Sequence, residues 1–479
     1  MPDKNDFTHN IVFIGNNGHF AKSKTTRASL DVVFAHLQQT NVQHIALYFH
    51  GGLVNEADGS ATALRLAERF KGGPAHFISF VWETGFFEII GRNVGDIAST
   101  TLFGELSEII TRKVSKYLIV PNGTGRGNVE LSSADVKQRI DKPGEPLADV
   151  QVRARGNAAN LREQEIDAIE NEFVQELTYE IDPEHPVVVL LEAEATQSDQ
   201  FNADSQITDS QAATGVKSRG LLMPIVVFRL AKAAAEVIRR YIRKTDHGPW
   251  PTIIEEILRQ FFLGNLGKGV WNNIKAIAEK TMWDTGNESI GGYFLHKLHQ
   301  YKQVNPHCRL DAVGHSAGSI AVCHLLRNAP DLKWQQLVFF APACTHKLFY
   351  DEVVTYPERF GQFRMFTMAD EFETADSLAN GLYPASLLYL VSGTFEPDVD
   401  TPILGMERYL GNNLPYNADQ SLELAGVRAF LEAQPDRVVL AESPIGAEAG
   451  FKTLATRHGD FDDDILTLDS LNTLLTTKL

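Results

Sequence analysis

Cysteine is scarce in this chain of 479 residues, which contains three: Cys308, Cys323 and Cys344. Their number is odd and no two stand in C-x-x-C spacing, so the sequence predicts neither a disulfide framework nor a cysteine zinc site. Long apolar runs are also lacking, since none approaches the ~18 residues that a membrane-spanning helix needs. The N-terminal stretch MPDKNDFTHN has no apolar signal-peptide core. These absences favour a cytoplasmic protein.

Basic residues are few relative to acidic ones. The chain has 44 Lys and Arg against 61 Asp and Glu, and a formal net charge of -17. Because phosphate binding needs concentrated Lys and Arg, this balance argues against nucleic acid as a partner.

Phosphate and cofactor motifs are incomplete. A phosphate loop would need glycine where Phe20 stands. Gly123, Gly125 and Gly127 miss the third glycine position of a dinucleotide fingerprint. Four acids near the end of the chain (Asp460, Asp462, Asp463 and Asp464) lack the register of a calcium loop, and we attribute them to the dipole of the helix that follows. We therefore expect no cofactor and no metal.

The overall composition, with 43% hydrophobic and 22% charged residues, is typical of a globular protein. The length exceeds one ordinary core. Residues 1–100 and 287–479 alternate strands and helices, whereas residues 101–286 are mostly helical. We expect the first two ranges to form one core, with 101–286 as a cap or lid inserted into it and a smaller excursion at about 377–411.

Short apolar segments in the two core ranges predict strands. These are expected at residues 10–14, 44–53, 75–82, 310–313, 337–343, 363–368 and 437–441. The helix 61–70 between two of them gives a strand-helix-strand unit of parallel type. The fold class expected is α/β, a mostly parallel sheet flanked by helices.

Helical spacing dominates the inserted range. Residues 221–244 form a helix with basic residues along one side and an apolar face on the other. This stripe is more typical of a helix packed over a neighbouring domain than of one lying on a membrane, so membrane contact is not expected. One strand is expected at 186–191, and a mobile loop at 196–220.

The pattern Gly314-His315-Ser316-Ala317-Gly318 joins an apolar strand to an apolar helix face. Glycines on both sides permit the close approach of strand and helix around a strained, exposed serine. The sequence predicts a nucleophile elbow at Ser316. The strand 44–53 ends in His50-Gly51-Gly52, and glycines there can direct backbone N–H groups toward a developing negative charge. An ordinary glycine turn is the alternative.

The order of these features resembles the α/β-hydrolase superfamily, in which nucleophile, acid and histidine follow one another along the chain. The resemblance covers about residues 1–100 and 287–479. It implies an α/β-hydrolase fold in which the range 101–286 is the variable lid.

The resemblance also implies roles for individual residues. Ser316 is the nucleophile, and its oxyanion hole is formed by the N–H groups of Ala317 and Gly52, with Leu53 in reserve. The acid follows the second strand after the elbow, which selects Asp370, although Glu371, Glu373 and Asp376 lie close enough to keep the choice open. His458, between the last strand and the final helix, is the base.

The activity expected is that of a serine esterase or lipase-like hydrolase, acting on a small-molecule or lipid ester through an acyl-enzyme. Acyl transfer, thioester cleavage and peptide cleavage use the same residues and stay open as alternatives. A binding or scaffold protein with a hydrolase core is a further alternative from another class. Neither the substrate nor the oligomeric state follows from the sequence.

Overall fold

The computed structural model describes most of the chain. Described are residues 9–15, 18–51, 56–82, 96–97, 99–121, 128–129, 153–154, 162–195, 219–262, 268–284, 288–378, 381–411, 415–416 and 421–477. The chain divides into two compact units. The first comprises Met1–Ile89, Val270–Asp376 and Pro402–Leu479, and the second comprises Ile90–Gly269 and Ser377–Thr401. The second unit therefore combines parts of the two ranges, 101–286 and about 377–411, that the sequence pattern separates from the core.

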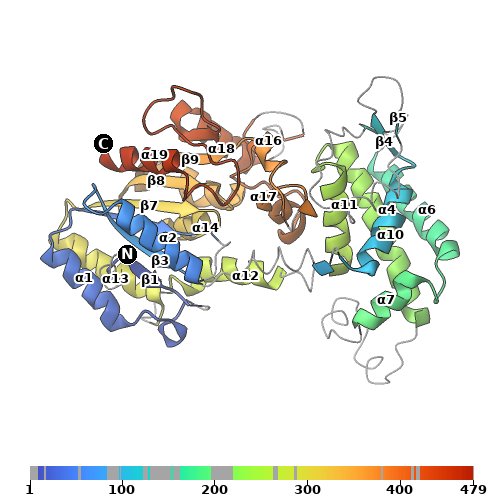
Figure 1. The fold of residues 1–479 in the computed structure, drawn as a ribbon, viewed down its shortest axis with the longest axis horizontal. Coiled ribbons are helices and arrows are strands. Elements are labelled where there is room, and N and C mark those ends of the chain that lie inside the picture. Colours follow the sequence, from blue (N-terminus) through green and yellow to red (C-terminus); the bar gives the residue numbers. More distant parts are fainter. Residues whose placement is uncertain are drawn as a thin grey trace. The chain divides into compact units, whose positions relative to one another are not determined.

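A seven-stranded sheet organises the first unit (Figure 1). Its strands are, in spatial order, β1 (Ile11–Phe13), β3 (His76–Val81), β2 (His44–Phe49), β7 (Arg309–His315), β8 (Trp334–Phe340), β9 (Phe360–Met368) and β10 (Val438–Ala441). Every neighbouring pair is parallel. The sheet confirms the predicted α/β class, and each predicted core strand overlaps an observed one. Because the strands are parallel, the loops after β2, β7, β9 and β10 leave the same edge of the sheet.

Helices cover both faces of this sheet. Helices α2 (Glu56–Arg69) and α19 (Ile465–Thr476) pack on one face, where Leu66 and Leu471 join a cluster with Tyr48, Phe340 and Phe366. The opposite face carries aromatic contacts to α13 (Ile290–Val304) and α15 (His346–Phe349), such as Phe80 to Phe294 and Phe363 to Phe349. The remaining helices and short helical turns of this unit are η2 (Phe20–Lys22), α1 (Arg27–Gln39), η5 (Ile277–Thr281), α13 (Ile290–Val304), α14 (Gly318–Asn328), α15 (His346–Phe349), η6 (Tyr350–Val354), η7 (Pro357–Arg359), α16 (Asp370–Glu373), η10 (Glu407–Tyr409), α18 (Leu422–Glu432) and η11 (Pro435–Arg437).

The second unit is mainly helical in its described part. Its elements are α4 (Thr101–Val114), β4 (Leu118–Pro121), β5 (Asn128–Val129), β6 (Arg153–Ala154), α6 (Glu163–Glu180), α7 (Pro186–Ala195), α10 (Arg219–Arg243), α11 (Pro249–Ile257), η4 (Leu258–Phe262), α17 (Leu387–Leu390) and η9 (Val391–Phe395), and α12 (Lys268–Ala276) spans its boundary. The strands β5, β4 and β6 form a small antiparallel sheet. The mobile loop predicted at 196–220 lies outside the described residues except for its last two.

The strand predicted at 186–191 is wrong, because these residues open helix α7. A short apolar run does not by itself distinguish a buried strand from a buried helix. Pro186 occupies the first position of the helix, where proline is favoured because its missing N–H has no partner to lose. Val187, Val188 and Leu191 are buried at helical spacing.

Helix α10 buries its apolar face within the second unit, where it contacts α4, α6, α7 and α11. The sequence favours packing of this helix over a neighbouring domain, whereas the contacts that cover its apolar face come from helices of its own unit. Two of its basic side chains, Arg239 and Arg243, pair with Glu163 of α6. The stripe of charges thus takes part in a helix–helix contact within the second unit.

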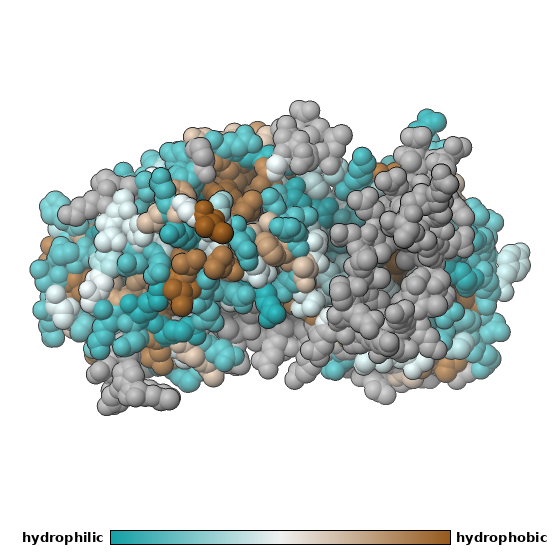
Figure 2. Space-filling view, turned by 45° about the horizontal axis from the view of Figure 1, so that its top comes forward, coloured by the Kyte–Doolittle hydropathy of each residue, from teal (hydrophilic) through white to brown (hydrophobic). Residues whose placement is uncertain are grey.

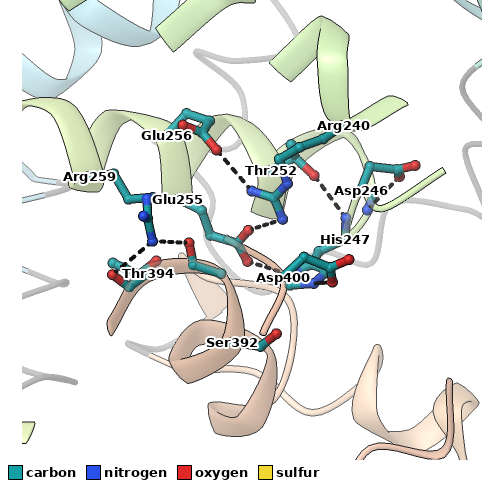
Figure 3. A network of polar contacts seen from close by, with 12 residues as sticks. Arg240, Asp246, His247, Thr252, Glu255, Glu256, Arg259, Ser392, Thr394 and Asp400 are labelled. Carbon is teal, nitrogen blue, oxygen red and sulfur yellow. Dashed lines mark hydrogen bonds and ion pairs between the residues drawn. The ribbon is translucent and has the colours of Figure 1, made fainter. Parts of the chain in front are cut away.

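A buried polar network connects α10 and α11 with the segment 377–401 (Figure 3). Arg240 Nη2 lies 2.6 Å from Glu255 Oε2, and Arg240 Nη1 lies 3.2 Å from Glu256 Oε1. The ring of His247 contacts Glu255 Oε1 at 2.8 Å through Nδ1 and Asp400 Oδ1 at 3.1 Å through Nε2. The network explains why two segments distant in sequence form one unit, since each buried charge needs its partner.

The coloured residues of the face in Figure 2 are mainly hydrophilic, in line with the net charge of -17, and hydrophobic residues gather in a limited area among them. Among the described residues, no helix combines the length and the apolar character that crossing a bilayer would require.

Candidate active site

Ser316 lies in the turn between β7 and α14, with a backbone φ of 52°. This left-handed conformation is unfavourable for any residue other than glycine, so the surrounding structure must maintain it. The glycines on both sides of the turn allow strand β7 and helix α14 to pack closely around it. A Cβ on Gly318 would lie 2.0 Å from the carbonyl oxygen of Phe49, and one on Gly314 would lie 2.8 Å from the backbone of Gly318. The predicted strand-turn-helix geometry around Ser316 is therefore present.

Backbone hydrogen bonds anchor the turn to strand β8 and the loop after it. The N–H of Ser316 donates to the carbonyl of Phe340 at 2.8 Å, and its carbonyl accepts from the N–H of Ala343 at 3.0 Å. The hydroxyl of Ser319 also donates to that carbonyl, at 2.6 Å. These bonds offset the cost of the strained φ angle.

His458 contacts the hydroxyl of Ser316, with Nε2 and Oγ separated by 2.8 Å. The histidine belongs to the loop between β10 and α19. Both side chains are buried, which differs from the exposed position expected for the serine. The physical reason is the close packing around it: besides His458, the turn after β2 approaches so closely that a Cβ on Gly51 would lie 3.1 Å from the Cβ of Ser316.

Burial, and secondarily the positive charge of His315, lowers the pKa of His458 to about 3. The ring is therefore neutral near pH 7. A neutral imidazole whose Nε2 faces a hydroxyl can accept its proton if Nδ1 carries the ring hydrogen. Within the described part of the chain, Nδ1 of His458 is buried and has no hydrogen-bond partner. The arrangement thus contains the serine–histidine contact, and it orients the histidine by other means than a carboxylate on Nδ1.

The acid candidates follow strand β9. The carboxylate of Asp376 contacts the main chain of His458, because its Oδ2 accepts the backbone N–H of this histidine at 3.1 Å. Asp370 is the first residue of α16, and its own N–H donates to the carboxylate of Glu407 at 2.7 Å. Glu371 is exposed and Glu373 is buried. Of the four candidates, Asp376 is the one for which the structure gives a hydrogen bond to His458.

Ala317, the first of the predicted oxyanion donors, is buried at the start of α14. Gly52 and Leu53 lie outside the described residues. The turn before them is held by His50, whose Nδ1 contacts the carbonyl of Gly51 at 2.6 Å and whose Nε2 accepts the N–H of Trp82 at 3.2 Å. Burial lowers the pKa of His50 to about 4, so this histidine is a neutral link between the ends of β2 and β3.

Sequence reasoning missed two residues beside the site, His315 and Asp462. His315 Nδ1 lies 3.4 Å from Asp462 Oδ2, and its Nε2 lies 3.0 Å from the carbonyl oxygen of His458. Asp462 was attributed to the dipole of the following helix. The structure gives that role to Asp464, which caps α19, whereas Asp462 is buried. The sequence offers only position as a signal for these two residues: His315 directly precedes Ser316, and Asp462 lies close to His458 in the chain.

No group of three or more His, Cys, Asp or Glu side chains in the described part of the chain is arranged to hold a metal ion. The geometry at Ser316 and His458 suits removal of a hydroxyl proton and attack by the resulting oxygen on an electrophilic carbon.

Comparisons of the chain with protein families, with curated proteins and with solved structures gave no match.

Proposed function

We propose that this protein is a serine hydrolase of the α/β-hydrolase type that cleaves a carboxylic ester through an acyl-enzyme on Ser316. The observation that carries the proposal is the 2.8 Å contact between Ser316 Oγ and His458 Nε2 at a serine with a left-handed backbone. A strained turn that presents a serine to a neutral histidine is costly to maintain, and nucleophilic catalysis is the function that such a turn serves.

The order of the loops supports the same proposal. The His50-Gly51 turn follows β2, the serine follows the adjacent strand β7, Asp370 and Asp376 follow β9, and His458 follows β10. All these residues therefore leave the carboxyl edge of a parallel sheet, which is where ligands bind in open α/β folds.

In the proposed reaction His458 Nε2 takes the proton of Ser316 as Oγ attacks the ester carbonyl carbon. The tetrahedral oxyanion accepts hydrogen bonds from the N–H of Ala317 and from the glycine turn after β2. The intermediate collapses, His458 gives its proton to the departing alcohol oxygen, and the acyl group stays on Oγ. Water, deprotonated by the same histidine, then attacks the carbonyl carbon of the acyl-enzyme; the bond to Oγ breaks, the acid leaves, and His458 returns the proton to Ser316 Oγ.

Among the acid candidates we propose Asp376 as the one that positions His458, because its carboxylate accepts the main-chain N–H of this histidine, with Asp370 as the alternative from the sequence pattern. The cap function of the helical insertion, which would set substrate choice, stays a prediction.

A fluorophosphonate probe tests the proposal without knowledge of the substrate. We expect covalent label on Ser316, located by mass spectrometry of the digested protein, and none on heat-unfolded protein. Ser316→Ala should abolish the label and reduce turnover of short-chain p-nitrophenyl esters by about 10⁴-fold or more, because the nucleophile is lost while little core volume changes. Folded protein that takes no label would contradict the proposal and favour the binding or scaffold alternative.

A further inference from the structure

The ring of His315 faces an acceptor at each nitrogen. Nδ1 points to the carboxylate of Asp462 at 3.4 Å, and Nε2 points to the carbonyl oxygen of His458 at 3.0 Å. A neutral imidazole has only one N–H, so it can satisfy one of these acceptors but not both. Both contacts are hydrogen bonds only if His315 is an imidazolium.

The surroundings of Asp462 fit this charge. Its Oδ2 accepts the hydroxyl of Tyr48 at 2.8 Å, and Arg65 lies 3.9 Å from Oδ1. Burial by itself would raise the pKa of Asp462, but His315, Tyr48 and Arg65 hold that pKa below its ordinary value. The carboxylate is therefore ionised and buried, and such a group needs a cation beside it.

The charged groups around His315 favour its protonated form. Burial would lower the pKa of His315, but Asp462, the His458 carbonyl and the nearby Asp463 raise it above its ordinary value. Asp463 itself pairs with Arg65 of α2. Burial is the main cause of the lowered pKa values of His50, on the β2 side, and of His458, and the positive charge of His315 lowers both further.

His315 also connects two parts of the site. Its backbone belongs to β7, in register with Phe340 of β8, and the ring packs against Phe340 and Phe461. Its bond to the His458 carbonyl therefore ties the loop of the base to the strand that carries Ser316. Asp376 accepts the main-chain N–H of His458, while Nδ1 of the His458 ring has no hydrogen-bond partner among the described residues. The orientation of His458 is supplied through its main chain.

We propose that His315 is a positioning residue that is an imidazolium at neutral pH, kept charged by Asp462, and that it holds His458 in reach of Ser316 through the His458 carbonyl. This inference rests on the proposed function only in the role it gives to His458. A direct consequence is an alkaline limit. When the pH rises through the pKa of His315, the ring keeps one N–H, which the Asp462 carboxylate attracts to Nδ1, so the hydrogen bond from Nε2 to the His458 carbonyl is lost.

The charge of His315 is measured by ¹⁵N NMR of the full chain labelled at histidine, with the His315 signals identified by their loss in His315→Gln. We expect both ring nitrogens to be protonated at neutral pH. In Asp462→Asn the pKa of His315 should fall by about one unit or more, because the stabilising anion is gone. A neutral His315 at neutral pH, or an unchanged pKa in Asp462→Asn, would overturn the inference.

The positioning role is measured by the rate of fluorophosphonate labelling of Ser316 across pH. We expect the wild-type rate to fall at alkaline pH, and the fall to begin at lower pH in Asp462→Asn by the same shift as the NMR pKa. His315→Gln should label without this alkaline fall, because an amide N–H can donate to the His458 carbonyl at any pH. The matched control Asp469→Asn removes an acid of α19 that pairs with Arg69 at the surface, and should leave the profile unchanged.

The two proposals fail in different ways. Absence of label on folded wild-type protein contradicts the hydrolase, whereas the NMR titration still decides the charge of His315. Labelling of Ser316 with the same pH profile in Asp462→Asn as in the wild type contradicts the positioning role and leaves the hydrolase intact. Circular dichroism of each variant separates loss of fold from loss of position.

Discussion

At the scale of single residues, the choice of acid is the sharpest open question. Asp376 accepts the N–H of His458, whereas the N–H of Asp370 donates to Glu407. We expect Asp376→Asn to slow labelling of Ser316 and ester turnover by about tenfold, because the main-chain N–H of His458 loses a charged acceptor and keeps at most an amide oxygen. Asp370→Asn, the matched control, should change both rates by less than about threefold. A severe loss in Asp370→Asn with a mild one in Asp376→Asn would restore the assignment made from the sequence pattern.

The pH dependence of the base is also decided at this scale. His458 accepts a proton only when its ring is neutral, and burial together with His315 lowers its pKa from 6.5 to about 3. The labelling rate of folded protein should therefore stay constant as the pH falls from 7 to 5, where an ordinary histidine would already be protonated. A fall of the rate with a midpoint near 6.5 would show that the ring titrates normally.

The same shift has a consequence for stability. Between the ordinary and the lowered pKa, the unfolded chain binds a proton at this histidine that the folded chain does not bind, so the stability from this group is lost as the pH falls. The upper limit of its contribution is about 1.4 kcal/mol for each pH unit. Urea unfolding of wild-type protein and of His458→Gln, compared at pH 7 and pH 5, should show a smaller pH dependence in the variant.

At the scale of elements, helix α10 allows a comparison of a buried and an exposed ion pair. Arg240 is buried with Glu255 and Glu256, whereas Arg243 and its partner Glu163 are both about half exposed, at 53% and 51%. We expect Arg240→Met to lower the free energy of unfolding of the second unit by about 3–5 kcal/mol, because two buried carboxylates lose their cation. Arg243→Met, the matched control, should cost less than about 1 kcal/mol. Equal effects in urea unfolding would contradict the assigned role of the network.

At the scale of the whole molecule, two compact units predict two unfolding transitions. The first unit has its core in the sheet, and the second has its own buried helices and polar network. Units with separate cores commonly unfold as separate cooperative blocks. Scanning calorimetry should resolve two components, and Arg240→Met should shift one of them while the other stays in place. A single two-state transition with equal calorimetric and van't Hoff enthalpies would show instead that the units unfold together.

Much of the fold class and the centre of the site could be predicted because their signals are local. Apolar runs of strand length define the sheet, and glycines at fixed spacing define the turn at Ser316, so neighbours in the chain carry the information. His458 followed from its place in an order of elements. The segment 186–191 shows the limit of local signals, because its helix is set by what it packs against.

The sequence by itself determined the strand-turn-helix pattern at Ser316, because the two glycines and the apolar runs on either side of the serine are local signals. The left-handed φ of Ser316 is maintained by its hydrogen bonds to Phe340 and Ala343. Only the tertiary structure decided what surrounds it. His458 is 142 residues from Ser316, Asp462 is 147 residues from His315, and Asp376 is 82 residues from His458. The physical reason is that charge and hydrogen-bond partners are chosen by distance in space, and an acid next to a helix start looks the same in sequence whether it caps that helix, as Asp464 does, or neutralises a buried imidazolium, as Asp462 does.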